Sequence, residues 1–124
     1  LLTKCLSEMS MYSKARGANP ATFLGLAGVG DFFSTALSSD SRNYKFGEFL
    51  ADGISPESAL DKVGDTVEGY GTSLIVQQSA KDLKVDLKLL NYLISIYQEP
   101  KTLSDDKKIF HSLGIERDIN FEFK

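Results

Sequence analysis

The sequence has one cysteine, no long apolar run and no excess of positive charge. The single cysteine, Cys5, excludes an internal disulfide and fits the reducing cytoplasm, where we expect this protein to be. We expect its side chain to be a small buried apolar group. No apolar run reaches the roughly 20 residues that cross a bilayer, and no signal peptide is visible. The net charge of −3 argues against a nucleic-acid surface, so any anion site must be local.

Several motifs of binding chemistry are also missing. The sequence has no zinc-ligand spacing, phosphate-binding P-loop, internal repeat or low-complexity tract, and no metal site is predicted. The dinucleotide-binding fingerprint is missing as well. Gly25, Gly28 and Gly30 follow no strand pattern, and no acid at the expected distance completes a βαβ unit. Because the chain begins with Leu1 rather than Met, we expect a piece of a longer protein.

What the sequence does contain is the pattern of a helical domain. Its 124 residues, 42% of them hydrophobic, suffice for one globular domain with its own core. Apolar residues recur at spacings of three and four, and capping residues precede several of these runs. The predicted fold is all-α, a single domain of about six helices with short glycine-marked connections. The predicted helices cover residues 1–17, 43–53, 56–64, 66–83, 87–99 and 104–114, with a shorter helical segment from Pro20.

Two of these helices carry more detailed expectations. Asp86 is expected to cap the helix over 87–99, which is the most apolar one and is predicted to be central and buried. In the helix over 43–53, the aromatic residues Tyr44, Phe46 and Phe49 are expected in the core rather than in a binding surface. Near the end of the chain, His111 is given no catalytic role. The alternating residues 119–123 favour either a short edge strand or a segment that lies along a helix.

The stretch GLAGVGDFFSTALSSDSRN, residues 25–43, contains the candidate site. Three glycines within six residues followed at once by Asp31 predict a shaped turn that holds an acid. Further on, Ser41 caps a helix whose first turn carries Arg42 and Asn43. A helix N-terminus has free N–H groups and the positive end of the helix dipole, so it favours an anion, to which Arg42 adds charged donors. The residues alone leave open an ordinary cap, a solvated charge and a tight loop.

The motif VEG at residues 67–69 opens another predicted helix. Glu68 is an acid in the first turn, where the helix dipole favours negative charge. Taken together, GLAGVGD, Thr35, SRN and TVEGYGT resemble the C-terminal half of bacterial-type NAD(P)-dependent glycerol-3-phosphate dehydrogenases. The resemblance holds in order and spacing from Leu2 to about Gln98. It implies that residues 1–124 are the helical C-terminal substrate domain, like that of 6-phosphogluconate dehydrogenase-like enzymes.

In this family, an N-terminal Rossmann domain binds NAD or NADP, and dihydroxyacetone phosphate and glycerol 3-phosphate are interconverted by hydride transfer. The resemblance implies that Asp31 orients a catalytic lysine and binds the substrate hydroxyl. It assigns the substrate phosphate to Ser41, Arg42 and Asn43. The lysine and the Rossmann domain are absent from this chain, so the isolated chain is expected to be inactive.

The resemblance also assigns cofactor contacts to Arg42, Thr66 and Glu68. Its implied partners are a small phosphate substrate and the chain's own Rossmann domain, with a homodimer left open. The chain departs from the usual family pattern at apolar positions such as Val29, and these changes leave the polar motif residues intact. Two alternatives remain. One is a non-catalytic helical domain that binds an anionic ligand or a protein partner, and the other is a related dehydrogenase for another hydroxy compound.

Overall fold

The computed structural model describes residues 1–99, which form six α-helices and no β-strand. In chain order the elements are α1 (Leu2–Ala15), the 3₁₀-helix η1 (Pro20–Leu24), the π-helix η2 (Leu26–Gly30), α2 (Asp31–Ala36), α3 (Arg42–Ala51), α4 (Pro56–Val63), α5 (Glu68–Asp82) and α6 (Lys88–Gln98). The predicted all-α class is therefore confirmed. The helix predicted over 104–114, His111 and the alternating tail lie outside the described residues. None of the described helices is long and apolar enough to span a membrane.

Local signals in the sequence set where most helices begin and end. The Ser41 and Ser55 hydroxyls accept hydrogen bonds from backbone N–H groups three residues on, at 3.4 and 3.3 Å, and so cap α3 and α4. Asn19 caps η1 through its side-chain oxygen, which accepts the backbone N–H of Ala21, two residues on, at 3.0 Å. Gly17 and Gly64 follow α1 and α4 with φ of 83° and 70°, a left-handed conformation that glycine adopts without steric cost. These predicted boundaries are confirmed.

The glycine-rich stretch before Asp31 is helical, and the prediction of a shaped turn is wrong. Residues 26–30 form the π-helix η2, which runs directly into α2. Gly30 has φ −61° and ψ −49°, an ordinary right-handed helical conformation. Glycine within a helix costs only about 1 kcal/mol relative to alanine, which neighbouring packing can offset. Asp31 is therefore the first residue of α2 rather than a residue held in a loop.

The main core lies between α3, α4 and the start of α5. Phe46, Leu50, Ala59 and Val67 are buried there. Two tyrosines, Tyr70 from α5 and Tyr97 from α6, pack against Phe46, with ring centroids 5.6 and 6.0 Å from that of the phenylalanine. The expectation that the aromatic residues of α3 belong to the core is confirmed for Phe46 and, since it is half-buried against this cluster, for Phe49. Tyr44 departs from it, with 38% of its surface exposed.

The cap of α6 comes from a distant part of the chain rather than from Asp86. Leu87 occupies the N-cap position and its side chain caps nothing, while Asp86 accepts a hydrogen bond from Asn91. Instead, the carboxylate of Glu8 on α1 accepts hydrogen bonds from the backbone N–H groups of Leu89 and Leu90, in the first turn of α6, at 2.8 and 3.2 Å. The predicted Asp86 cap is wrong because a tertiary contact supplies the acceptor.

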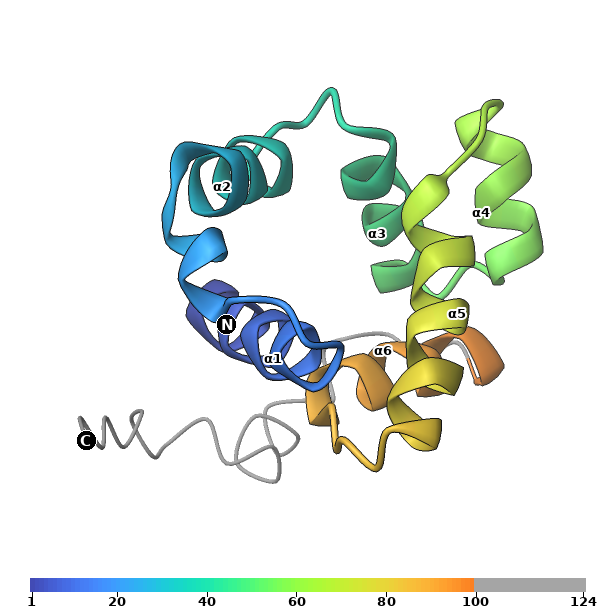
Figure 1. The fold of residues 1–124 in the computed structure, drawn as a ribbon. Helices are drawn as coiled ribbons and strands as arrows, with labels where there is room; N and C mark the ends of the chain where they lie inside the picture. Colours follow the sequence, from blue (N-terminus) through green and yellow to red (C-terminus); the bar gives the residue numbers. More distant parts are fainter. Residues whose placement is uncertain (100–124) are drawn as a thin grey trace.

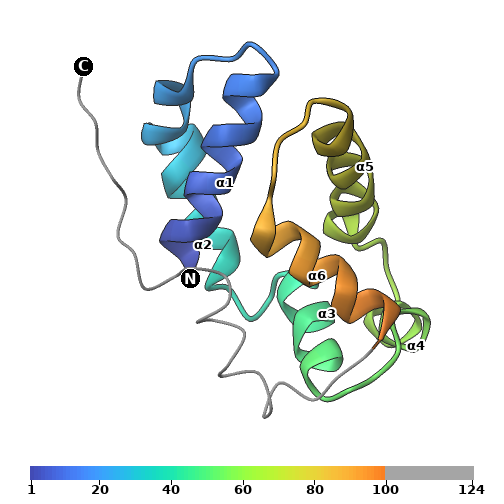
Figure 2. The same cartoon turned by 90° about the horizontal axis from the view of Figure 1, so that it is seen from below.

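The helices are arranged in two parts. Residues 2–36, from α1 to α2, form what we call the α1–α2 arm, and residues 42–98 form the α3–α6 bundle (Figure 1). Viewed from below, α6 lies between α1 and the other helices of the bundle (Figure 2). It packs against α1 and α5, and α3 packs against α4 and α5. The arm and the bundle are joined covalently by the short segment 37–41, close to the residues that were predicted to bind ligand.

Candidate functional site

A polar hollow of about 410 Å³ lies where α3 and α5 begin. Its lining residues are Ser34, Thr35, Ser38, Asp40, Ser41, Arg42, Asn43, Thr66 and Glu68. Five of the six predicted site residues are among them, although they come from segments about 25 residues apart. Asp31 is the exception. The fold thus brings together the SRN and VEG motifs that the sequence could only place separately.

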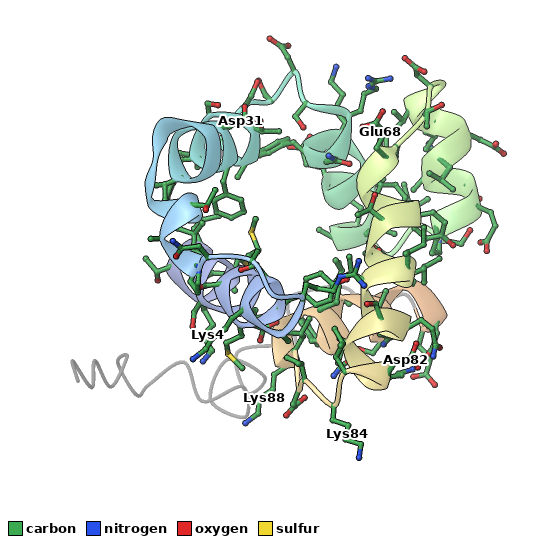
Figure 3. All side chains as sticks on the ribbon, viewed as in Figure 1. Lys4, Asp31, Glu68, Asp82, Lys84 and Lys88 are labelled. Carbon is green, nitrogen blue, oxygen red and sulfur yellow. The ribbon has the colours of Figure 1, made fainter. Side chains whose placement is uncertain are left out.

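Asp31 lines a neighbouring, more apolar hollow of about 490 Å³. Met9, Phe32 and Tyr44 lie around it. The two hollows are contiguous, because both are lined by Thr35, Ser41 and Asn43. The complete lining of the second hollow is Met9, Gly28, Asp31, Phe32, Thr35, Ala36, Ser41, Asn43 and Tyr44. Figure 3 shows Asp31 on α2 and Glu68 at the start of α5, both at the upper end of the molecule. The structure therefore places Asp31 beside the anion-binding motif rather than within it.

Arg42 forms an ion pair that the sequence did not suggest. Its Nη1 donates to Oδ2 of Asp65 at 2.8 Å, and Oδ1 of Asp65 accepts the backbone N–H of Thr66 at 2.7 Å. The two side chains are 50% and 64% exposed, so solvent screening limits the pair to less than about 1 kcal/mol. Only one guanidinium N–H is used in this contact. The remaining donors of Arg42 are available to an anion in the hollow.

Asn43 connects the two motifs directly. Its Oδ1 accepts the backbone N–H of Gly69 at 3.1 Å, which ties the first turn of α3 to the first turn of α5. A Cβ atom at position 69 would lie only 2.5 Å from the same oxygen. A side chain at position 69 would therefore have to displace the exposed side chain of Asn43 and break this hydrogen bond. Because the oxygen of the amide is engaged, its NH₂ group is the part that can donate to a ligand.

Two helix N-termini meet at this hollow. Ser41 caps α3, whose first N–H groups have no acceptors within the helix. Glu68 is the first residue of α5 and is exposed, as is Thr66 just before the helix. The prediction that Glu68 is a first-turn acid is confirmed. One side of the hollow thus offers cationic and N–H donors, while the other offers a carboxylate and a hydroxyl that can bind polar groups of a ligand.

Sequence reasoning did not assign roles to Thr35 or Asp65. Thr35 follows Asp31 by four residues, a spacing that puts both on one face of α2, and this periodicity could have identified it. Asp65 lies three residues before Glu68, but its pairing with Arg42 depends on how α3 and α5 pack. Among the described residues, no group of three or more His, Cys, Asp or Glu side chains is arranged to hold a metal ion.

Comparison with known proteins identifies the family. The model of the NAD-dependent glycerol-3-phosphate dehydrogenase C-terminus matches residues 1–106. The chain belongs to this family. It is 37% identical to the glycerol-3-phosphate dehydrogenase (NAD(P)+) of Pseudomonas aeruginosa PAO1 and 38% identical to that of Pseudomonas syringae pv. tomato DC3000, each over 121 residues. The predicted resemblance to glycerol-3-phosphate dehydrogenases is confirmed.

These relatives are much longer than the chain. The alignments cover 98% of this chain and 36% of each relative, so the chain spans about a third of the length of the curated dehydrogenases it matches. No solved structure matches it. The match to a C-terminal family model and the helical fold agree that these residues correspond to the C-terminal domain of the family.

Proposed function

We propose that this chain is the substrate domain of an NAD(P)-dependent glycerol-3-phosphate dehydrogenase and that its N-terminal partner domain binds most of the cofactor. The observation that carries the proposal is the single hollow in which Ser41, Arg42, Asn43, Thr66 and Glu68 meet. Membership in the family and the names of the relatives supply the reaction. We expect the complete protein to work in the cytoplasm, in keeping with the single, unpaired cysteine of this chain.

The phosphate of the substrate binds at the start of α3. The N–H groups there and the positive end of the helix dipole favour a dianion, and the guanidinium of Arg42 adds charge-assisted hydrogen bonds. Asn43 donates from its NH₂ group, since its oxygen is held by Gly69. Asp65 holds Nη1 of Arg42 and so fixes the orientation of the guanidinium, whose other N–H groups can donate to the phosphate. Together these groups bind the phosphate end of dihydroxyacetone phosphate or glycerol 3-phosphate.

Asp31 acts at the other end of the substrate. A bound nicotinamide would accept the hydride released when the C2–H bond of glycerol 3-phosphate breaks, and a lysine outside this chain would accept the hydroxyl proton, which leaves a ketone. Asp31 orients that lysine and accepts a hydrogen bond from a substrate hydroxyl. Its place in a hollow contiguous with the phosphate site supports this role. A three-carbon substrate can then contact both α2 and α3.

The residues at the start of α5 fit only one end of a dinucleotide. Thr66 and Glu68 are exposed at the hollow, where a hydroxyl and a carboxylate can bind an amide or ribose hydroxyl of NAD or NADP, and Arg42 lies within the same hollow. The described helices contain no parallel sheet of the kind that binds a complete dinucleotide. We therefore assign the rest of the cofactor, and the choice between NAD and NADP, to the partner domain.

The test is a spectrophotometric assay of the full-length dehydrogenase, which follows nicotinamide oxidation with dihydroxyacetone phosphate. The 124-residue chain alone is the control. We expect activity in the long form and none in the short form. An inactive long form with both NADH and NADPH would contradict the dehydrogenase proposal and favour a helical domain that binds an anion without chemistry. Activity with a hydroxy compound that lacks phosphate would favour the related-dehydrogenase alternative.

A further inference from the structure

The candidate site is assembled from both parts of the molecule. Asp31 and Thr35 belong to the α1–α2 arm, whereas Arg42 and Asn43 belong to the α3–α6 bundle. At the site the two parts are joined by the short segment 37–41 (Figure 1). A segment of this length keeps the parts near each other but does not fix their mutual orientation. The contact between the arm and the bundle at the opposite end must do so.

That contact is centred on Glu8 of α1. Its side chain is buried, with 7% exposure, and its two oxygens accept the N–H groups of Leu89 and Leu90 at 2.8 and 3.2 Å. Nearby, the hydroxyl of Tyr12 donates to Oγ of Ser79 on α5 at 3.0 Å. Glu8 is separated from its partners by 81 and 82 positions in the sequence. These hydrogen bonds hold α1 against α5 and α6.

The Glu8 contact is specific in direction as well as in position. The carboxylate faces the N-terminus of α6, where the helix dipole is positive and N–H groups need acceptors, and charge-assisted hydrogen bonds of this kind are strong. The helix supplies no cap of its own, because its N-cap residue is Leu87. A carboxylate that accepts two adjacent N–H groups fixes both the distance and the rotation of α1 relative to α6.

We propose that Glu8 is a positioning residue for the candidate site: by capping α6 it sets where the α1–α2 arm places Asp31 relative to Arg42 and Asn43. The path is a continuous series of packed elements, since α1 packs against η1, η1 against η2, and η2 against α2. Asp31 is the first residue of α2 and so moves with it. The catalytic consequence rests on the proposed function of Asp31, whereas the structural one does not.

The structural part is tested by measuring a distance across the site. In a Cys5→Ser background, spin labels are attached to cysteines at Ser34 on α2 and Asp61 on α4, both of which are exposed. Glu8→Gln keeps the size of the side chain but removes its charge and one acceptor, and we expect a shifted or broadened distance distribution. Ile54→Val, which weakens the core around α3 and α4, is the control and should leave the distribution unchanged. An unchanged distribution in Glu8→Gln overturns the proposal.

A milder variant keeps the proposal testable if Glu8→Gln does not fold. Tyr12→Phe keeps the ring and removes only the hydroxyl that contacts Ser79. We expect it to broaden the same distribution, though less than Glu8→Gln does. If Glu8→Gln does not fold, Tyr12→Phe decides the matter, and a distribution identical to that of the parent chain counts against the proposal.

The catalytic part is tested by a double-mutant cycle in the full-length dehydrogenase. Misplacement of a reacting group by about 1 Å can cost up to about 100-fold in rate, so we expect Glu8→Gln to lower kcat by about 10-fold or more. The KM for dihydroxyacetone phosphate should change little, because the phosphate site lies in the bundle. If Glu8 acts through Asp31, Glu8→Gln has little further effect in an Asp31→Asn background, whereas independent effects multiply and overturn the proposal. Were Asp31→Asn itself without effect on kcat, the role of Asp31 would be rejected, and the distance measurement would still decide the structural part.

Discussion

At the residue scale, the side-chain oxygen of Asn43 lies so close to Gly69 that a methyl group in place of the glycine hydrogen atom would meet it. A methyl group on residue 69 would meet the Asn43 oxygen at 2.5 Å, so Gly69→Ala must displace the amide that joins α3 to α5. Asn43 is exposed and its side chain can move aside, so we expect the cost to be that of the lost hydrogen bond, about 1 kcal/mol. The higher helix propensity of alanine offsets a similar amount, so the net change in stability should be small. Thermal or urea unfolding followed by circular dichroism measures it. In the full-length dehydrogenase, the same change should also weaken substrate binding through Asn43.

Gly71 is the matched control for this prediction. It lies two residues further along the same helix, is exposed, and would place a Cβ atom with nothing within 4 Å. Gly71→Ala should therefore stabilise the chain by up to about 1 kcal/mol, through helix propensity alone. If both variants changed stability alike, the hydrogen bond between Asn43 and Gly69 would contribute nothing to stability.

Arg42 allows ligand binding to be separated from folding. Its ion pair with Asp65 is half exposed, so Arg42→Ala should change the free energy of unfolding by less than about 1 kcal/mol. In the full-length dehydrogenase, the loss of a charged partner for the bound phosphate should cost about 2–5 kcal/mol, seen as a higher KM and a lower kcat/KM. Steady-state kinetics with dihydroxyacetone phosphate measures both.

Lys45→Ala is the control for Arg42, because Lys45 lies on the same helix, is exposed and does not line the hollow. It should leave KM near that of the parent enzyme if the effect of Arg42 depends on its place rather than on net charge. Unchanged kinetics in Arg42→Ala would reject the phosphate-site assignment.

At the scale of whole elements, the sequence was informative wherever a helix boundary is decided locally. The Ser41 and Ser55 hydroxyls accept hydrogen bonds from N–H groups only three residues away, and Gly64 ends α4 because it adopts a left-handed conformation. Such contacts require no knowledge of the fold. The glycines before Asp31 gave a wrong prediction of a turn because glycine suits both a turn and an unusual helix. The packing of neighbouring elements decides between the two.

The α6 cap and the Arg42 ion pair could not have been predicted in this way. Glu8 and Asp65 are ordinary acids in the sequence, and each acquires its role from a segment that folding brings near. A hint does exist for Glu8, since it lies three residues after Cys5 and four before Tyr12 and so shares the inner face of α1. An acid on such a face predicts a buried partner but does not identify it.

Two titratable groups on α1 and α6 make stability depend on alkaline pH. Burial, with a smaller contribution from Glu8, raises the pKa of the Cys5 thiol, and burial raises the pKa of the Tyr97 hydroxyl. The unfolded chain therefore loses these protons at lower pH than the folded chain. Their contribution to stability is complete at neutral pH and is lost as the pH rises above the ordinary thiol pKa of about 8.5 toward the raised values.

The measurement is the midpoint of thermal unfolding at neutral pH and at pH values above the thiol range. Relative to the parent chain, Cys5→Ser should flatten the first part of the alkaline decline, and Tyr97→Phe the later part, because each removes one group with a raised pKa. An alkaline decline that is identical in the parent chain and in both variants would show that other groups cause it.

At the scale of the whole molecule, we expect the phosphate site to lie in this chain and most of the cofactor site to lie outside it. The hollow that gathers Ser41, Arg42 and Asn43 lies within this chain, whereas the chain spans only 36% of the length of its dehydrogenase relatives and has no dinucleotide-binding fingerprint in its sequence. We therefore expect the isolated 124-residue chain to bind glycerol 3-phosphate weakly and to bind NADH far more weakly than the full-length dehydrogenase does.

Amide chemical shifts in a ligand titration would test this separation. Glycerol 3-phosphate should shift the signals of residues 41–43 and of Gly69, because we propose that its phosphate binds at the start of α3 and the hydrogen bond from Gly69 to Asn43 links this site to α5. Glycerol, which lacks the phosphate, should shift none of them, and Arg42→Ala should abolish the response to glycerol 3-phosphate. Tight, saturable binding of NADH by the isolated chain would place the main cofactor site here and contradict the proposal that a partner domain binds most of the cofactor. Equal responses to glycerol and glycerol 3-phosphate would instead remove the phosphate from the interaction and leave the hollow as a general polar site.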